Sequence, residues 1–172
     1  MQELVKMTAD DIEVCTEIYV KAFEKTKEYQ SICDFDHYFS SFIKSEDKYA
    51  YVLKVDNKIV GLLTAFQIPS FVDGFSVHID SVAISPEYQH QGNGRAMLKS
   101  FIDLISDGSG ITINAYKDKP SYKLYVDVGF YDIDNISHLM YSPELAKLKK
   151  QYEELEKERA ELQAELDKRD QN

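Results

Sequence analysis

The sequence predicts a layered α/β domain, in which helices cover a mixed sheet, followed by a long C-terminal helix. Segments with helical spacing alternate with β-rich segments over the first 141 residues, in the order β α α β β β α β α β β. The composition changes near Pro143, where residues that favour helices begin to dominate. The chain has 172 residues, enough to bury a real core. We therefore expect a domain over 1–142 and a separate helix over 143–172.

The first half of the domain predicts a strand, two helices and a hairpin. Acidic residues follow Thr8, which is a favourable way to begin a helix. Asp56-Asn57 between two β-rich runs indicates a tight hairpin turn. The expected elements are a strand over 4–7, a helix after Thr8, a helix over 34–44, and strands over 49–55 and 58–68.

The second half predicts three further strands and two helices before the tail. Gly129 is a favourable helix end, because glycine adopts a left-handed cap at little cost. The expected elements are a strand over 75–84, a helix from Gly92 or Asn93 to Ile105, a strand over 111–115, a helix over 120–128, and a hairpin of 130–133 with 136–141.

The segment 143–172 predicts a helix with a heptad seam. It contains no Gly, Phe or β-branched residue. The seam has a period of 3.5 residues, as in a coiled coil. Its positions are Leu145, Leu148, Tyr152, Leu155, Arg159, Leu162, Leu166 and Arg169. We expect a homodimer through this helix, with packing on its own domain or exposure to solvent as the alternatives.

The net charge of the chain limits the classes of molecule that it is expected to bind. Thirty acidic and 20 basic side chains give a formal net charge of -10, so nucleic-acid binding is not expected, whereas cationic amines are favoured. No apolar run reaches the roughly 18 residues that a membrane helix needs. Cys15 and Cys33 have neither metal-site spacing nor the number for a disulfide framework. We therefore expect no metal and a reducing, cytoplasmic location.

The segment 79–98 carries the most chemical information, because an apolar strand runs through a loop directly into a helix. The loop reads Gln89-x-x-Gly92-x-Gly94. Two glycines let the backbone turn tightly, so that consecutive N–H groups point into one concavity at a helix N-terminus. Such a concavity binds a pyrophosphate without lysines, which suits an acidic chain. A plain tight turn is the alternative interpretation.

Two segments together carry motifs of one known family. Gln89-His90-Gln91-Gly92-Asn93-Gly94 fits an Arg/Gln-x-x-Gly-x-Gly/Ala loop, and Val82-Ala83-Ile84-Ser85-Pro86-Glu87 fits the strand and turn before it. Leu124-Tyr125-Val126-Asp127-Val128-Gly129-Phe130 fits a Leu-Tyr-x-x-x-Gly-Phe signature. In these motifs the chain resembles the GNAT superfamily of acetyl-CoA-dependent N-acetyltransferases. The resemblance covers residues 4–141 and implies a mixed, mostly antiparallel sheet covered by helices.

The resemblance implies how acetyl-CoA would bind as a co-substrate. The strand backbone would pair with the pantetheine arm, and the loop amides would hold the pyrophosphate. The implied contacts are Val82, Ala83 and Ile84 in the strand, and Gln89, His90, Gln91, Gly92, Asn93, Gly94 and Arg95 in the loop. Arg95, Lys99 and Lys123 are candidates for the outer phosphate, with solvated surface as the alternative.

The resemblance also implies a role for Tyr125. By its place in the Leu-Tyr pair, it would lie near the thioester sulfur and protonate the departing thiolate. An aromatic residue on an amphipathic helix otherwise belongs to the core. The family often has Asn and Ala seven and four residues earlier, where this chain has Asp118 and Ser121. Because Asp118 would repel an anionic co-substrate, Ser121 is the expected polar contact.

Acetyl transfer to an amine requires a free lone pair, yet an alkyl ammonium with a pKa of about 10.4 keeps its proton at neutral pH. A general base is therefore expected. His78 and Asp80 differ by two positions, so they are expected to share a face that Val82 and Ile84 continue toward the co-substrate. Family members often carry a carboxylate base here. Either residue could instead bond a neighbouring strand.

These features predict an N-acetyltransferase that moves the acetyl group to a primary amine of a small molecule or peptide. Direct attack in a ternary complex is expected, because no Ser or Cys is placed for a covalent intermediate. By resemblance, the acceptor pocket lies between 29–39 and 69–75, where Tyr29, Phe35, Tyr38 and Phe71 could line it, with packing in the core as the alternative. The alternative is an acyl-CoA-binding regulatory or scaffold module, with little or no turnover, that recruits partners through its coiled-coil tail.

Overall fold

A computed structural model of the chain describes residues 2–23, 34–70, 74–105, 110–133, 148, 151–161 and 163. The chain divides into two compact units, Met1–Tyr131 and Asp132–Asn172. The expected boundary between 142 and 143 lies outside the described residues, so it stays a prediction.

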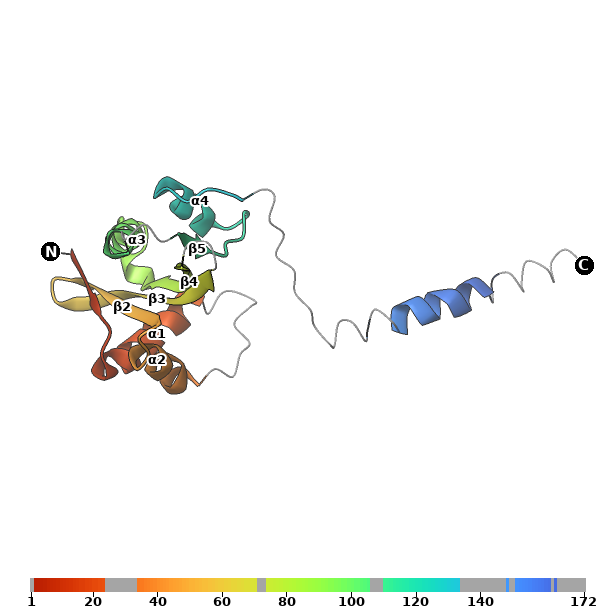
Figure 1. The fold of residues 1–172 in the computed structure, drawn as a ribbon, viewed down its shortest axis with the longest axis horizontal. Helices are drawn as coiled ribbons and strands as arrows, with labels where there is room; N and C mark the ends of the chain where they lie inside the picture. Colours follow the sequence, from red (N-terminus) through yellow and green to blue (C-terminus); the bar gives the residue numbers. More distant parts are fainter. Residues whose placement is uncertain are drawn as a thin grey trace, which may run out of the picture. The chain divides into compact units, whose positions relative to one another are not determined.

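The first unit is built on a five-stranded sheet with the order β1-β2-β3-β4-β5 (Figure 1). Neighbouring strands are antiparallel except β4 and β5, which are parallel. The strands are β1 (Gln2–Lys6), β2 (Lys48–Val55), β3 (Lys58–Ser70), β4 (Gly74–Ile84) and β5 (Ile111–Ile113). The expected mixed, mostly antiparallel sheet is confirmed, with β5 shorter than the predicted 111–115.

Helices cover both faces of this sheet: α1 and α2 lie on one side, and α3 and α4 on the other (Figure 1). Short 3₁₀ turns precede two of them. These elements are η1 (Ala9–Asp11), α1 (Ile12–Phe23), α2 (Phe35–Ile43), η2 (Pro86–Tyr88), α3 (Asn93–Leu104) and α4 (Pro120–Asp127).

The local signals in the sequence explain where several elements begin and turn. The carboxylate of Asp34 accepts a hydrogen bond of 2.9 Å from the His37 N–H, so Asp34 caps α2. Asp56 and Asn57 have φ angles of 48° and 65°. Two successive left-handed residues make the type of turn that matches the twist of a hairpin, which is why β2 and β3 join so tightly.

Two apolar clusters form the core, one on each face of the sheet. The α3-side cluster consists of Tyr51, Leu53, Val60, Leu63, Ala65, Val77, Ile79, Ile84, Met97, Leu98, Phe101 and Ile105. The α1-side cluster consists of Met7, Ile12, Cys15, Ile18, Phe39, Phe42, Ala50, Val52, Leu62 and Ala83. Strands β2, β3 and β4 therefore contribute side chains to both clusters.

Strand β4 changes its facing at Asp80. In the pairing of β3 with β4, Thr64 is opposite Ser81 and Ala65 is opposite Ile79, so Asp80 is an extra, unpaired residue. This is a β-bulge. Before it, Ile79 lies in the α3-side cluster; after it, Val82 packs there as well, three positions later.

The bulge overturns one expectation from the sequence. His78 contacts Phe66, which packs on the α1-side cluster, and Asp80 bonds Tyr38 of α2. Val82 and Ile84 pack on the opposite face, with the α3-side cluster. The prediction that they continue the face of His78 and Asp80 is therefore wrong, because the extra residue inverts the alternation.

The last expected hairpin is not seen in the described part of the chain. Residues 130–133 form no strand, and the Phe130 N–H instead donates to the Tyr125 carbonyl at 3.1 Å, closing the end of α4. The expected partner, 136–141, lies outside the described residues. A strand requires a paired neighbour, so this hairpin stays a prediction.

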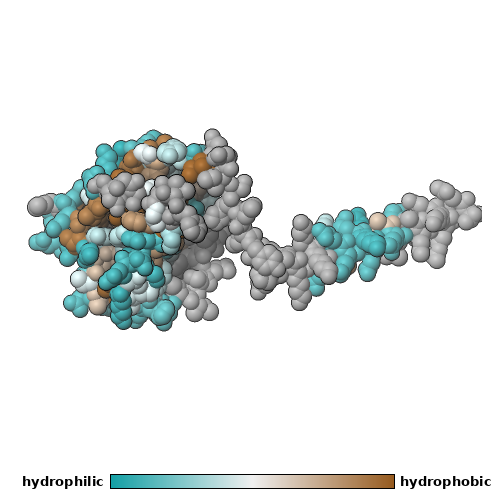
Figure 2. Space-filling model, in the orientation of Figure 1, coloured by the Kyte–Doolittle hydropathy of each residue, from teal (hydrophilic) through white to brown (hydrophobic). Residues whose placement is uncertain are grey.

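In the second unit, the described residues Leu148, 151–161 and Gln163 are all helical, as the sequence predicts. Three seam residues, Leu148, Tyr152 and Leu155, are 59%, 64% and 63% exposed. The surface of this helix is otherwise mainly hydrophilic (Figure 2). Other seam residues lie outside the described part, namely Leu145, Leu162, Leu166 and Arg169.

Candidate active site

Within the described residues, one edge of β4 is open beyond the end of β5. The parallel pairing runs from Val77 to Ile79 on β4, and β5 ends at Ile113, whereas β4 continues to Ile84. The Ser85 N–H donates to Val60 of β3 at 2.8 Å. Because successive residues of a strand direct their N–H and C=O groups to opposite edges, Val82 and Ile84 direct theirs to the open edge.

Side-chain amides take up backbone carbonyls of the loop that follows β4. Gln89 donates to the Ile84 carbonyl at 2.9 Å, Gln91 to Glu87 at 2.8 Å, and Asn93 to Tyr88 at 2.8 Å. Asn93 is also buried and accepts a bond of 2.7 Å from Gln2 of β1. These bonds fix the loop through its carbonyl groups. The N–H groups of Tyr88 and Gln89 also donate within the loop, to Ser85 at 2.8 Å and Pro86 at 3.3 Å.

The loop enters α3 through two left-handed residues. His90 and Gly92 have φ angles of 61° and 82°, and Gly92 caps the helix. The first bond inside the helix runs from the Ala96 N–H to the Gly92 carbonyl, at 3.0 Å. The N–H groups of Asn93, Gly94 and Arg95 therefore have no partner within α3, which makes this end electropositive.

The two glycines of the loop serve different purposes. Gly92 has open space where a side chain would lie, so its left-handed backbone is what requires glycine. Gly94 sits where a Cβ atom would come within 3.1 Å of Leu124 in α4 and 3.8 Å of Ile84 in β4. Its missing side chain lets α3, α4 and the open end of β4 meet.

An ion cluster lies beside this loop. Asp127 of α4 receives Arg95 at 2.9 Å and Lys123 at 3.1 Å. The hydrogen bond from Lys123 and the nearby charges hold the Asp127 pKa below its usual range. Two of the three cations suggested for the outer phosphate are thus paired with one carboxylate, which the sequence analysis did not identify.

Tyr125 packs against the α3-side cluster, and its ring meets that of Phe130 edge-on with 6.1 Å between centroids. Burial raises the pKa of its hydroxyl. In the described part of the chain, that hydroxyl makes no hydrogen bond. Ser121 and Asp118 are exposed, at the N-terminal end of α4 and before it.

Asp80 lies on the other face, next to α2. The Tyr38 hydroxyl donates to its Oδ2 atom, and Ser81 also donates to Oδ2, at 3.4 Å. The Tyr38 oxygen lies 2.9 Å from the hydroxyl of Thr64, which is fully buried. Thr64 was not among the site residues predicted from the sequence, although a single polar residue within the apolar run of β3 is an available signal.

His78 is held differently from Asp80, at the point where β4 and β5 still pair. Its Nδ1 atom lies 2.9 Å from the hydroxyl of Thr112 in β5, and its ring is 5.3 Å from that of Phe66. The two candidate bases therefore share a face, as expected. Tyr125 belongs to the opposite face, so a group that meets both must lie at the open edge of β4.

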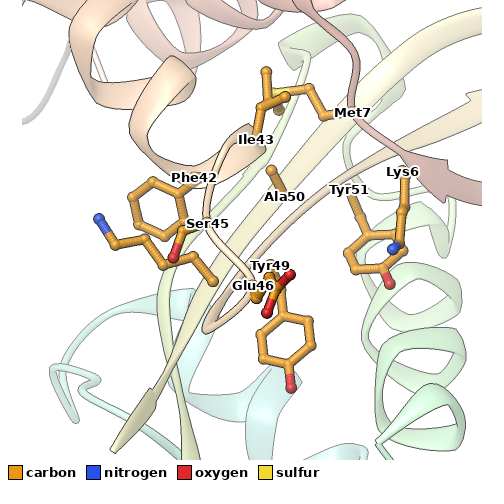
Figure 3. A pocket seen from close by; sticks show the side chains of 10 residues that line it. Lys6, Met7, Phe42, Ile43, Ser45, Glu46, Tyr49, Ala50 and Tyr51 are labelled. Carbon is orange, nitrogen blue, oxygen red and sulfur yellow. The ribbon is translucent and has the colours of Figure 1, made fainter.

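A hollow of about 320 Å³ lies elsewhere, where β1 leaves the edge of β2 (Figure 3). Met7, Phe42, Tyr49 and Tyr51 are among its lining residues. No candidate site residue lines it, and it lies at the β1 edge rather than the β5 edge of the sheet. Tyr29 and Phe71, two of the aromatics suggested for the acceptor pocket, lie outside the described residues.

Solved and curated proteins that are similar to this chain include the following three. An uncharacterised N-acetyltransferase from Bacillus methanolicus is 29% identical over 62 residues, which are 36% of this chain and about half (48%) of that protein. An aminoglycoside acetyltransferase from an uncultured soil metagenomic sample, solved with sisomicin, superposes with a TM-score of 0.67 and 18% identity over 82% of this chain and 95% of its own. A predicted acetyltransferase from Clostridium acetobutylicum, solved with acetyl-CoA, gives 0.64 and 18% over 81% and 96%.

The two solved structures share the fold of the described sheet and helices. At 18% identity, this likeness shows the fold and does not show a common substrate. The sequence profile of the acetyltransferase (GNAT) family matches residues 12–130, from α1 through the loop and α3 to the end of α4. This match spans more than half of the chain and includes both motifs that carry the resemblance. The chain belongs to the acetyltransferase (GNAT) family.

Proposed function

We propose that this chain is an N-acetyltransferase that moves the acetyl group of acetyl-CoA to a primary amine by direct attack. The observation that carries the proposal is the open edge of β4. On one face of that edge lie the amide-rich loop, α3 and Tyr125; on the other lies Asp80. A thioester seated at the edge would be within reach of both faces.

The residues at the open edge fit the chemistry of acetyl-CoA. The N–H and C=O groups of Val82 and the N–H of Ile84 would pair with the amides of the pantetheine arm as an additional strand does. The free N–H groups from Asn93 to Arg95 would hold the pyrophosphate at the N-terminus of α3. Ala83 directs its backbone toward β3 instead, and its side chain is buried, so its contribution is to packing.

The chain's residues would move two protons in this reaction. Asp80 takes a proton from the bound ammonium, and the freed nitrogen attacks the thioester carbonyl. As the C–N bond forms and the C–S bond breaks, the Tyr125 hydroxyl donates its proton to the sulfur. Burial keeps Tyr125 protonated at neutral pH, because it raises the pKa of the phenol. The attacking nitrogen loses its second proton to solvent as the amide forms, and solvent then returns a proton to Tyr125 and removes the one on Asp80.

Asp80 is the favoured base of the two candidates. Its Oδ1 atom takes no part in the contacts with Tyr38 and Ser81, and the residue is exposed. His78 instead bonds Thr112 of β5. We therefore assign His78 to the junction of β4 and β5 and Asp80 to proton transfer.

The acceptor is proposed to be a cationic amine. Residues 1–142 carry 21 acidic and 13 basic side chains, a net charge of -8, and an ammonium group would meet an anionic Asp80. Aminoglycosides belong in the tested range, since a solved neighbour of the same fold is an aminoglycoside acetyltransferase. Polyamines, amino acids and peptide N-termini complete it.

A thiol-release assay over this range tests the proposal. The full chain is incubated with acetyl-CoA and each amine, and the free CoA thiol is measured. We expect at least one amine to accelerate release well above hydrolysis, with a saturable rate. Binding of acetyl-CoA without accelerated release for any amine would instead favour the acyl-CoA-binding module.

We also propose that the C-terminal helix self-associates with a second copy of the chain. Leu148, Tyr152 and Leu155 occupy seam positions and are exposed within the described residues, and burying such a seam stabilises a coiled coil. Sedimentation of the full chain should give twice its own monomer mass, whereas a variant that ends at residue 142 should give its single monomer mass. A monomer mass for the full chain would rule the dimer out and leave the first unit's chemistry untouched.

We propose a reducing, cytoplasmic location because Cys15 is a free thiol. Its thiol is free and buried in the α1-side cluster. Burial raises its pKa to about 12, which keeps it unreactive.

A further inference from the structure

The hydroxyl of Tyr38 lies between two other oxygen-bearing side chains that come from different strands. Thr64 is in β3, Asp80 is in β4, and Tyr38 reaches both from α2. We propose that Tyr38, oriented by Thr64, is the positioning residue that holds the Asp80 carboxylate so that Oδ1 faces the acceptor amine. This inference rests on the proposed function, in which Asp80 is the base.

The donor and the acceptor can be assigned for each hydrogen bond of the relay formed by Thr64, Tyr38 and Asp80. An ionised carboxylate only accepts, so the single proton of the Tyr38 hydroxyl points to Asp80. The Tyr38 oxygen is then left as an acceptor, and the Thr64 hydroxyl, 2.9 Å away, donates to it. The relay therefore runs in one direction, from Thr64 to Tyr38 to Asp80.

Neither Thr64 nor Tyr38 is free to turn away. Thr64 is fully buried in the sheet, so its hydroxyl needs a partner on the protein. The Tyr38 ring packs against Phe42 and Phe39, with centroids 4.9 Å and 5.1 Å apart. The hydroxyl is thus delivered to one point above the bulge of β4.

Tyr38 also keeps its proton under all ordinary conditions. Burial raises the pKa of this phenol, and the hydrogen bond to the Asp80 carboxylate raises it further. A neutral phenol donates to the carboxylate, whereas a phenolate would repel it. The contact therefore persists across the pH range in which an acetyltransferase would work.

The geometry at the carboxylate gives the relay its purpose. Tyr38 and Ser81 both donate to Oδ2, and no described side chain bonds Oδ1. Asp80 occupies the bulge, where strand pairing does not hold its backbone in the regular register. A side chain there needs an external clamp, and holding one oxygen fixes the direction of the other.

Four variants test the inference in the full chain. Tyr38→Phe removes only the donor to Asp80, and we expect kcat to fall by roughly 10- to 100-fold, the scale of a misplaced catalytic group. The KM for acetyl-CoA should not change, because the loop and α3 lie on the other face. Thr64→Val should lower kcat less, by about threefold to tenfold, and Thr64→Ser, which keeps the hydroxyl, should restore it. Tyr49→Phe is the matched control, since its hydroxyl bonds Gln67 on the other face.

An NMR measurement reads the relay without turnover. The ring 13Cζ resonance of Tyr38, identified by its loss in Tyr38→Phe, should shift in both Asp80→Asn and Thr64→Val and stay unchanged in Tyr49→Phe. If the chemical shift of the Tyr38 13Cζ resonance stayed the same in both Asp80→Asn and Thr64→Val, the inference would be wrong. A Tyr38→Phe variant with wild-type kcat beside an impaired Asp80→Asn would also overturn it. If the wild type acetylates no amine, the proposed function fails, and the resonance alone decides whether Tyr38 clamps Asp80.

Discussion

The two faces of the sheet use β4 in different ways. On the α3 side, the residues near β4 contribute mainly backbone groups: the amides that begin α3 and the open edge at Val82 and Ile84. On the α1 side, the contribution comes from side chains, since Asp80, Tyr38 and Thr64 interact through carboxylate and hydroxyl groups. A single unpaired residue in β4 separates the two modes.

This difference teaches which part of the site tolerates change. Backbone donors are present whatever the side chains are, so the α3 side is sensitive to backbone geometry and close packing. A side-chain relay is lost by removing one oxygen. On the proposed function, substitutions in the loop on the α3 side should therefore affect acetyl-CoA binding, and those on the α1 side should affect the amine and the rate of transfer. Tyr125 is the exception on the α3 side, because its hydroxyl acts on the rate.

The largest effect is expected from Asp80→Asn, which keeps the shape of the side chain but removes its ability to take a proton. We expect kcat to fall by about 10²- to 10⁴-fold, the usual contribution of a general base. Acetyl-CoA affinity, measured by calorimetry, should stay at the wild-type value. Asp36→Asn, which changes an exposed carboxylate of α2, is the control. A loss of acetyl-CoA affinity in Asp80→Asn would break the division between the faces.

Tyr125→Phe is expected to have the next largest effect. It removes the proposed proton donor on the α3 side, and kcat should fall by about 10²-fold, the lower end of acid catalysis, because a thiolate is a good leaving group. Thermal stability should hold, since the hydroxyl makes no hydrogen bond in the described part of the chain. Tyr51→Phe, a buried tyrosine of the same cluster, is the matched control. Full activity in Tyr125→Phe would leave packing as the role of this residue.

Gly92→Ala should weaken acetyl-CoA binding without changing the KM for the amine. A Cβ atom meets nothing there, but φ is +82°, so the strain is purely conformational and costs about 1–2 kcal/mol. Gly110→Ala is the control, because its surroundings are equally open and its φ is not positive. The melting temperature and the acetyl-CoA dissociation constant are the measurements. If the two variants had the same acetyl-CoA dissociation constant, the left-handed backbone of Gly92 would not be needed for acetyl-CoA binding.

The smallest effect concerns the Asp127 cluster and appears only with pH. Bonding to Lys123 lowers the Asp127 pKa in the folded chain, so the carboxylate contributes stability above the pKa it has when unfolded. That contribution is lost as the pH falls toward the folded pKa. Asp127→Asn should therefore show a smaller loss of melting temperature between pH 7 and pH 3 than the wild type, with Asp36→Asn behaving like the wild type.

Local patterns were enough to predict most elements of the fold. The β-rich runs of β2 and β3, the turn at Asp56-Asn57 and the acidic residues after Thr8 each act within a few residues, so the sequence carries them directly. The glycine loop was found for the same reason. Its amide side chains bond carbonyls only four or five residues away.

The rest of the site depends on contacts that no local pattern contains. The bulge at Asp80 exists only in the pairing of β3 with β4, so a strict alternation put Val82 and Ile84 on the wrong face. Tyr38 and Asp80 are 42 residues apart, and no sequence pattern near either residue predicts the contact between them. The reason for Gly94 is likewise the approach of a distant helix, at Leu124.

The extra residue in β4 also separates the site into two sets of residues that can change independently during evolution. At and around it, the side chains of His78, Asp80 and Ser81 lie on the α1 side; farther along, the main chain of Val82 and Ile84 faces the edge that no described strand covers. On the proposed function, side-chain substitutions around Asp80 that keep Asp80 itself would change which amine is accepted, while the second set would bind the same co-substrate through atoms that every residue shares. New acceptor preferences would then require only side-chain substitutions, on an unaltered backbone.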